Sequence, residues 1–283
     1  MKLNRNRALL YLVLTSILWS MGGLFIKLID CNSFTIAGAR SGIAFLVISL
    51  YTRKKSFKPS KPSKMLVIGV ISYALLVILF VTSTKLTTSA NAIMLQFTAP
   101  IWVALLSHFI LNVKTSLNDW IIIIIVFLGI LLFFMGQLNS GNLLGNLLAV
   151  LSGICMAMMI ISMKYIKVEP IQITLFGNLL IFILSIPFLF QTHFSLRDLL
   201  YLIILGVFQL GISYILYTSA IKHVSALEGI LIPILEPILN PIWVLIFAGE
   251  RPGVYSLLGG IIVLTAITFR TIHLSRVSIS ESM

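Results

Sequence analysis

The sequence has few of the residues that keep a protein in water. Only 10% of its 283 residues are charged and 59% are hydrophobic, and the mean hydropathy is +1.09. A composition this apolar excludes a water-soluble globule, because soluble domains carry about 25% charged residues. The net charge of +12 would suggest nucleic acid in a soluble protein. Lys and Arg also accumulate in the cytoplasmic loops of membrane proteins, so we expect no nucleic-acid partner.

Cysteine and histidine are also scarce. The two cysteines, Cys31 and Cys155, and the four histidines form neither a disulfide framework nor a cluster of metal ligands. We therefore expect no metal and no cofactor. The apolar runs also lack the Ser-His-Asp set, the His-Glu-x-x-His motif and the paired aspartates that a lipid-acting enzyme would need. We predict that the protein is not an enzyme.

Long apolar runs fill most of the chain. A helix needs about 20 apolar residues to cross the hydrocarbon core of a bilayer. The sequence predicts an all-α integral membrane protein with ten transmembrane helices, at residues 8–29, 33–52, 65–84, 87–111, 120–138, 142–165, 170–190, 198–221, 224–248 and 253–272. The first run follows basic residues, as in a signal peptide. Its length of about 22 residues and the runs that follow predict an uncleaved helix instead.

The distribution of basic residues predicts the orientation. If both termini are cytoplasmic, fifteen of the twenty lysines and arginines fall on the inner side. Four fall on the outer side, namely Lys27, Lys85, Arg197 and Arg251, and Arg40 lies within the second run. This excess is the positive-inside pattern. We expect a multi-pass protein of the cell (inner) membrane with both termini in the cytoplasm.

The two halves of the chain repeat each other weakly. Similar residues recur at an offset of 137, namely Lys27 with Lys164, Lys85 with Lys222, Thr88 with Ser225, and Pro100 with Pro237. These pairs predict two five-helix repeats, at residues 1–138 and 139–283. Because each repeat has an odd number of spans, the second lies inverted, as in alternating-access carriers whose site lies between the halves. The alternative is an ancestral duplication without a transport role.

Several segments resemble a known family. The first predicted span contains Trp-Ser-Met-Gly-Gly and ends near Lys27, the second contains Arg40, and residues 235–237 and 248–251 read Leu-Glu-Pro and Ala-Gly-Glu-Arg. With these features the chain resembles the EamA-type ten-helix branch of the drug/metabolite transporter superfamily. The resemblance implies a secondary carrier for small polar metabolites, often an exporter of amino acids or related compounds.

Three charged residues stand clear of the span ends, Arg40, Glu228 and Glu236, and a charge inside the bilayer is a functional candidate. Ala99 occupies the position in the first half that is equivalent to Glu236, so any acidic role falls on the second half. Glu228 lies near the start of its span and can reach interfacial water. Glu236 lies mid-span beside Pro237, whose ring frees backbone carbonyls. We predict that Glu236 lines the site and titrates during transport, and the alternative is a structural pair with Arg40.

Helical spacing gives Glu236 polar and aromatic companions. Asn240 and Trp243 follow it by four and seven residues and share its face. Other spans contribute the remaining predicted substrate-binding residues, Trp19, Tyr73, Gln96, Gln209 and Tyr214. An acid among aromatic rings suits an organic cation or the ammonium group of a zwitterion, although the same acid could carry a proton instead.

The sequence therefore predicts a secondary active transporter that exports a small polar metabolite, such as an amino acid or an organic amine, by alternating access. Protons are the candidate coupling ion. The expected partners are the small-molecule substrate, protons and the surrounding membrane lipid, and we expect a monomer or a homodimer. The alternative is a membrane-embedded protein without transport activity, either a scaffold or a lipid-acting enzyme.

Overall fold

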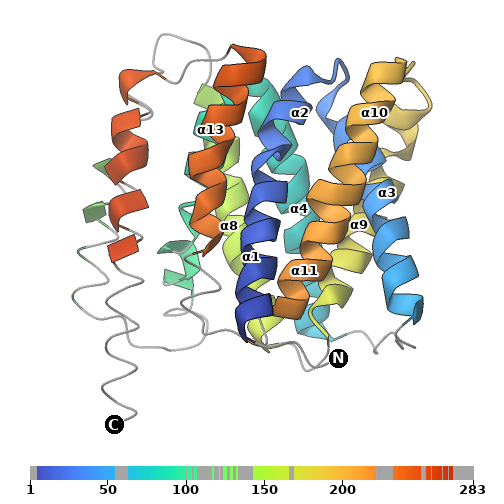
Figure 1. The fold of residues 1–283 in the computed structure, drawn as a ribbon, viewed down its shortest axis with the longest axis horizontal. Helices are drawn as coiled ribbons and strands as arrows, with labels where there is room; N and C mark the ends of the chain where they lie inside the picture. Colours follow the sequence, from blue (N-terminus) through green and yellow to red (C-terminus); the bar gives the residue numbers. More distant parts are fainter. Residues whose placement is uncertain are drawn as a thin grey trace.

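The computed structural model describes residues 5–54, 63–99, 143–165, 169–220 and 232–249, together with residue 223 and short stretches within 101–132 and 253–269. In this part of the chain every regular element is a helix (Figure 1). Among the described residues, six helices are long and apolar enough to cross a membrane, namely Arg5–Leu28, Ser33–Arg53, Lys64–Leu86, Leu143–Met163, Ile171–Leu189 and Leu196–Ala220. The all-α membrane fold is therefore confirmed.

The helices follow the predicted spans closely where the two overlap. The first half contains α1 (Arg5–Ser20), α2 (Gly22–Leu28), α3 (Ser33–Lys54), α4 (Lys64–Leu86) and α5 (Ser89–Gln96). The second half contains α8 (Leu143–Tyr165), α9 (Ile171–Leu189), α10 (Leu196–Ile204), the π-helix η1 (Leu205–Ile212), α11 (Ser213–Ala220), the 3-10 turn η2 (Ile232–Ile234) and α13 (Leu235–Ala248). The predicted spans 87–111, 120–138, 224–248 and 253–272 lie partly outside the described residues.

Side-chain caps fix the starts of three helices. Ser63 caps α4 and Thr88 caps α5, each by accepting a hydrogen bond from a backbone N–H three residues further on. Ser195 and Asp198 form a reciprocal capping box at the start of α10. These caps satisfy N–H groups that have no partner within the first turn of a helix. The chain can therefore turn between spans within a few residues.

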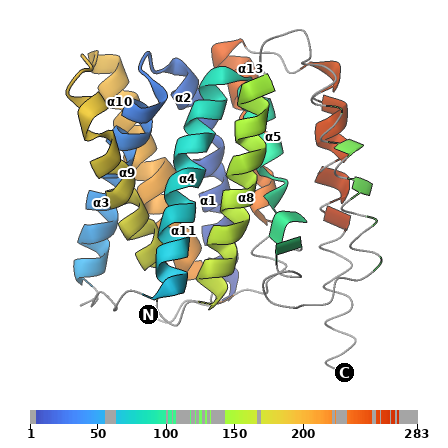
Figure 2. The same ribbon diagram turned by 180° about the vertical axis from the view of Figure 1, so that it is seen from behind.

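The first helices of the two repeats run in opposite directions. α2 and α4 finish at the same end of the bundle, because Lys85 Nζ donates to the carbonyl oxygen of Ile29 at 2.8 Å. We call this the α2 end, and it lies at the top of Figure 1. α8, the counterpart of α1 and α2, begins there, since a Cβ on Gly145 would lie 2.9 Å from the Cβ of Thr87. α1 thus runs toward the α2 end and α8 runs away from it (Figure 2).

The next two pairs of helices show the same inversion. α3 begins beside the end of α9, where the hydroxyl groups of Thr35 and Thr192 lie 3.0 Å apart. α11 finishes beside the end of α3, where the hydroxyl groups of Tyr51 and Ser219 lie 3.3 Å apart. The span from α10 to α11 therefore runs opposite to its counterpart α4. The predicted inversion is confirmed for the first three spans of each repeat.

Polarity is distributed as a lipid environment requires. Leu46 and Leu50 on α3 are each 61% exposed, whereas the polar side chains of Arg40, Asn178 and Asn240 are buried. In water this arrangement would leave a large apolar surface uncovered. In a bilayer, lipid covers that surface and the interior of the protein has to satisfy the polar groups. The chemistry of the molecule is therefore concentrated between the helices.

Candidate functional site

A small cavity lies between helices of the two repeats, and we call it the central cavity. Its lining residues are Trp19, Arg40, Leu76, Val77, Phe80, Gln96, Met156, Gln209, Leu210, Tyr214 and Glu236. Its volume is about 40 Å³. One water molecule needs roughly 10–15 Å³ of such space, so the cavity has room for a few waters. A metabolite would require the cavity to widen.

The structure brings six of the predicted residues to this cavity: Trp19, Arg40, Gln96, Gln209, Tyr214 and Glu236. Tyr73 lies next to it, with its ring centroid 5.3 Å from that of Tyr214. Asn240 and Trp243 are not among the lining residues, and their side chains donate hydrogen bonds to Ser20 instead. Glu228 lies outside the described residues.

Arg40 enters the cavity from α3, which packs tightly on α9. A Cβ on Gly38 would collide with Ser185, and a Cβ on Gly42 would lie 2.5 Å from the ring of Phe182. The two glycines are one helical turn apart, so they let α3 approach α9 closely. The Arg40 side chain is 1% exposed. Its Nη1 donates a hydrogen bond to Oε1 of Gln209 at 3.1 Å.

Gln209 lies on the π-helix η1, which sequence reasoning did not anticipate. Such wide turns are rare in helices and frequently occur at functional sites. Trp19 Nε1 donates to Ser213 Oγ at 2.8 Å, and Ser213 Oγ donates to the carbonyl oxygen of Gln209. These two side-chain hydrogen bonds therefore connect the first span to the backbone carbonyl of Gln209 in η1.

Aromatic rings form one side of the site. The ring of Trp19 lies 5.2 Å from the ring of Tyr214 and 5.2 Å from that of Tyr217, measured between centroids. Behind Tyr214, the hydroxyl group of Tyr73 accepts a hydrogen bond from Asn178 Nδ2 at 3.0 Å. Aromatic faces of this kind attract cations and apolar groups.

Glu236 lies in the first turn of α13 and is 6% exposed. The predicted span 224–248 is described from Ile232 onward, and there the 3-10 turn η2 precedes a helix that begins at Leu235, so the helix changes form at this point. Pro237 explains the break: proline is tolerated in the first turn of a helix, where its missing N–H has no partner to lose. The positive end of the α13 dipole favours a carboxylate at this position.

Arg40 and Glu236 share the central cavity without bonding to each other. The hydrogen bond of Arg40 goes to Gln209, its Nε has no hydrogen-bond partner, and no ion pair joins Arg40 to Glu236 in the described part of the chain. A basic and an acidic side chain thus line one cavity while remaining separate. A ligand placed between them could interact with both.

Asn240 and Trp243 stabilise a break in the first span. α1 ends at Ser20, whose carbonyl oxygen accepts a hydrogen bond from Asn240 Nδ2 at 2.9 Å. Trp243 Nε1 donates to Ser20 Oγ at 3.0 Å, and Ser89 Oγ donates to Asn240 Oδ1 at 2.8 Å. Glu236 and Asn240 therefore share one face of α13 but have different roles. Glu236 lines the cavity, and Asn240 donates to the carbonyl group at the end of α1. Interrupted helices at mid-depth are typical of transporter sites.

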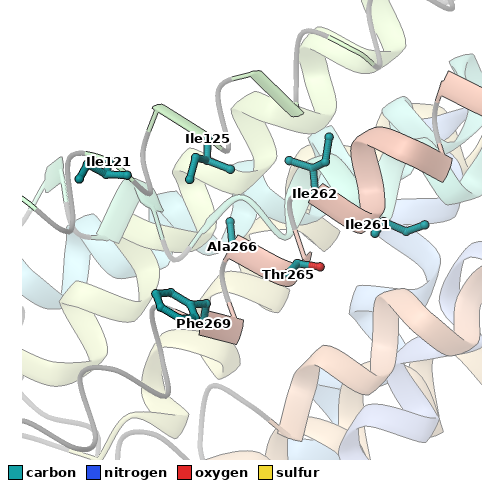
Figure 3. Close-up of a pocket in the computed structure, with 7 residues that line it drawn as sticks. All are labelled: Ile121, Ile125, Ile261, Ile262, Thr265, Ala266 and Phe269. Carbon is teal, nitrogen blue, oxygen red and sulfur yellow. The ribbon is translucent and has the colours of Figure 1, made fainter.

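A larger groove elsewhere is almost entirely apolar. Its volume is about 560 Å³, and it is lined by Ile121, Ile125, Ile261, Ile262, Thr265, Ala266 and Phe269 (Figure 3). None of these side chains is charged, so the groove does not suit a polar substrate. In a bilayer such a surface suits the acyl chains of lipids.

The described residues contain no group of three or more His, Cys, Asp or Glu side chains that could hold a metal ion. Cys31 and Cys155 are both free thiols. The groups that the site offers to a ligand are therefore a guanidinium, a carboxyl, two amides and several aromatic rings.

Inverted repeats of membrane-spanning helices around a shared polar cavity define a class of protein, the membrane transporters. The chain belongs to the EamA-like transporter family, whose model matches residues 6–135 and residues 143–272. The two matches are separated by the offset at which the paired lysines and prolines recur. The family is the one that the sequence features resembled, so that prediction is confirmed.

Individual relatives agree with this assignment. The chain is 24% identical over 282 residues to the uncharacterized transporter YxxF of Bacillus subtilis (strain 168), covering 95% of this chain and 91% of that protein. It is 22% identical over 244 residues to the uncharacterized transporter YdfC of the same organism, covering 83% and 80%. A solved crystal structure superposes with a TM-score of 0.67 at 15% identity over 94% of this chain and 98% of that one. At that identity the likeness shows the fold alone.

Proposed function

We propose that the protein is a secondary active carrier that moves a small polar metabolite, such as an amino acid or an organic amine, by alternating access through the central cavity. The supporting observation is that a buried basic side chain, Arg40, and a buried acidic side chain, Glu236, line one cavity between inverted repeats. Charges in the membrane interior are costly and usually serve a function. Rocking of one repeat against the other exposes such a cavity to each side of the membrane in turn.

Proton coupling through Glu236 is part of this proposal. Among the described residues that line the cavity, Glu236 is the acid. A carboxyl group that takes up a proton on one side of the membrane and releases it on the other couples the proton flux to the substrate flux. We further propose export across the inner membrane with both termini in the cytoplasm. The distribution of basic residues supports the orientation, and the family resemblance supports the direction.

Transport by the purified protein in liposomes tests the function. Labelled amino acids, amines, nucleosides and sugars are offered with and without a pH gradient, together with an exchange assay that needs no gradient. We expect at least one compound to cross and a pH gradient to drive its accumulation. Glu236→Gln should lose the gradient-driven accumulation and retain exchange.

Glu169→Gln serves as the matched control, because it removes an exposed carboxylate near the start of α9 and should leave both activities intact. If no compound of any class crosses, the carrier function is wrong and a scaffold becomes the better explanation. Equal gradient-driven transport by Glu236→Gln and the wild type would remove proton coupling through this residue but keep the carrier.

A further inference from the structure

Arg40 is a buried guanidinium with part of its hydrogen-bonding edge unused. The side chain is 1% exposed and the guanidinium stays protonated in proteins. Its Nη1 donates to the neutral amide oxygen of Gln209 at 3.1 Å, while its Nε has no hydrogen-bond partner among the described residues. A buried charge with an unsatisfied donor is unfavourable. An anionic group that reaches this edge therefore gains a strong partner.

We infer that Arg40 binds the carboxylate of the transported substrate, and that Gln209 occupies the place of this carboxylate while the cavity is closed. This inference rests on the proposed carrier function and narrows its substrate class. A guanidinium donates two parallel N–H groups that match the two oxygens of a carboxylate. The amide of Gln209 offers one neutral oxygen to the same group, so it is the weaker partner.

The surroundings of Gln209 suit such an exchange. A Cβ on Gly206 would lie 2.8 Å from the carbonyl oxygen of Arg40, and a Cβ on Gly22 would lie 2.9 Å from Nε2 of Gln209. η1 therefore lies against the backbone of α3, and the amide of Gln209 lies against the break between α1 and α2. A carboxylate that displaces this amide acts directly on two irregular segments, the π-helix and the interrupted first span.

The remaining walls restrict the rest of the substrate. Glu236 lines the same cavity and, when it is ionised, disfavours a simple anion, whereas Trp19 and Tyr214 offer aromatic surface. Inorganic phosphate would place negative charge near Glu236 and leave the aromatic wall unused. An amine without a carboxylate would leave Arg40 with its amide partner. A small organic carboxylate with an apolar or cationic remainder uses all of these groups.

Thermal unfolding of the detergent-purified protein tests this with matched ligands. The probes are phenylalanine and leucine, their decarboxylated amines phenethylamine and isoamylamine, and inorganic phosphate. A ligand well above its Kd raises the Tm by mass action. We expect at least one carboxylate to raise the Tm, and its amine and phosphate to leave it unchanged.

An equal shift with the amine would overturn the inference, and an equal shift with phosphate would replace it with an unselective anion site. If the liposomes transport amines, nucleosides or sugars and neither carboxylate shifts the Tm, the carboxylate site is wrong and the carrier function stands. If nothing is transported, the proposed function itself fails.

Gln209→Glu provides a test within the protein. It places a carboxylate at the position that already bonds to Arg40, so we expect a higher Tm without ligand and loss of the response to the carboxylate. Gln96→Glu is the matched control, since it makes the same change on the same cavity at a residue without a bond to Arg40 in this structure, and it should lower the Tm. Arg40→Gln should weaken carboxylate binding by about tenfold or more. A Gln209→Glu protein with a lowered Tm and an unchanged ligand response would contradict the inference. This result does not depend on whether Arg40→Gln folds.

Discussion

Lys27 and Lys85 each cap the C-terminal end of the helix that contains the other lysine. Lys27 Nζ donates to the carbonyl oxygen of Thr87, the C-cap of α4, at 2.7 Å, and Lys85 Nζ donates to the carbonyl oxygen of Ile29, the C-cap of α2, at 2.8 Å. The last carbonyls of a helix lack intrahelical partners, and the negative end of the helix dipole attracts cations. These two reciprocal hydrogen bonds join α2 to α4 at the α2 end of the bundle.

Lys85→Met should therefore destabilise the protein although it makes the span more apolar. The change removes the charged hydrogen bond to Ile29 while keeping a long side chain. We expect a loss of about 1 kcal/mol in the free energy of unfolding, since the lysine is only half-buried. Thermal unfolding in detergent measures it.

Lys64→Met is the control for this prediction. Lys64 is exposed at the first residue of the same helix, so its replacement should change the Tm little. A Lys85→Met protein as stable as Lys64→Met would show that the hydrogen bond from Lys85 to Ile29 contributes nothing to stability.

Cys31, in the turn after α2, reports on the same end of the bundle. Burial raises the pKa of its thiol, the carboxylates of Asp198 and Asp30 raise it further, and Lys85 opposes them. The thiolate is the reactive form. In a Cys155→Ser background, maleimide labelling of Cys31 should rise with pH and level off above the range of a free cysteine, whose pKa is about 8.5.

Asp30→Asn should move this labelling profile to lower pH, because it removes one of the two carboxylates that disfavour the thiolate. Stopped-flow labelling between pH 6 and roughly 10 measures both profiles. A wild-type profile that levels off at or below the pH of a free cysteine would contradict the expected effect of burial and of the carboxylates.

The sequence predicted the spans well because the length of an apolar run is a local property. It could not predict the break at Met21 or the π-helix η1, since both depend on partners from elsewhere in the chain. Asn240 satisfies the carbonyl of Ser20, and Ser213 satisfies that of Gln209. The pair Gly22 and Gly23 after Ser20 was the available signal for the break. No pattern in residues 205–212 marks a π-helix.

The sequence also could not predict that Glu236 and Asn240 on α13 have different roles. Helical spacing correctly placed Glu236 and Asn240 on one side of a helix, but only Glu236 is among the residues that line the central cavity. Residues four apart differ slightly in direction, and a cavity this small receives one of them. Which residue faces it depends on the position of Ser20, which belongs to the other repeat.

Asn240→Asp tests the structural role of this amide. The substitution keeps the shape but replaces the Nδ2 donor, so the carbonyl oxygen of Ser20 loses its partner in a buried position and faces a carboxylate. We expect a loss of about 1–3 kcal/mol in the free energy of unfolding without any ligand. Gln191→Glu, the same change at an exposed turn, is the control. Equal stability of both variants would show that the hydrogen bond from Asn240 to Ser20 does not stabilise the interrupted helix.

The contact between Gly38 on α3 and Ser185 on α9 offers a reciprocal test of packing beside Arg40. A Cβ on Gly38 would collide with the Cβ of Ser185, whereas the Ser185 Cα would lie at an ordinary 3.6 Å. Gly38→Ala should therefore cost about 1–3 kcal/mol in the free energy of unfolding through overpacking. Ser185→Gly removes the colliding atoms, and the Ser185 hydroxyl has no hydrogen-bond partner to lose in the described part of the protein. In the double variant we expect most of the cost of Gly38→Ala to disappear, because contacting residues are coupled. Thermal unfolding of the four proteins gives this coupling directly, and additive effects would mean that α3 and α9 do not pack through these two residues.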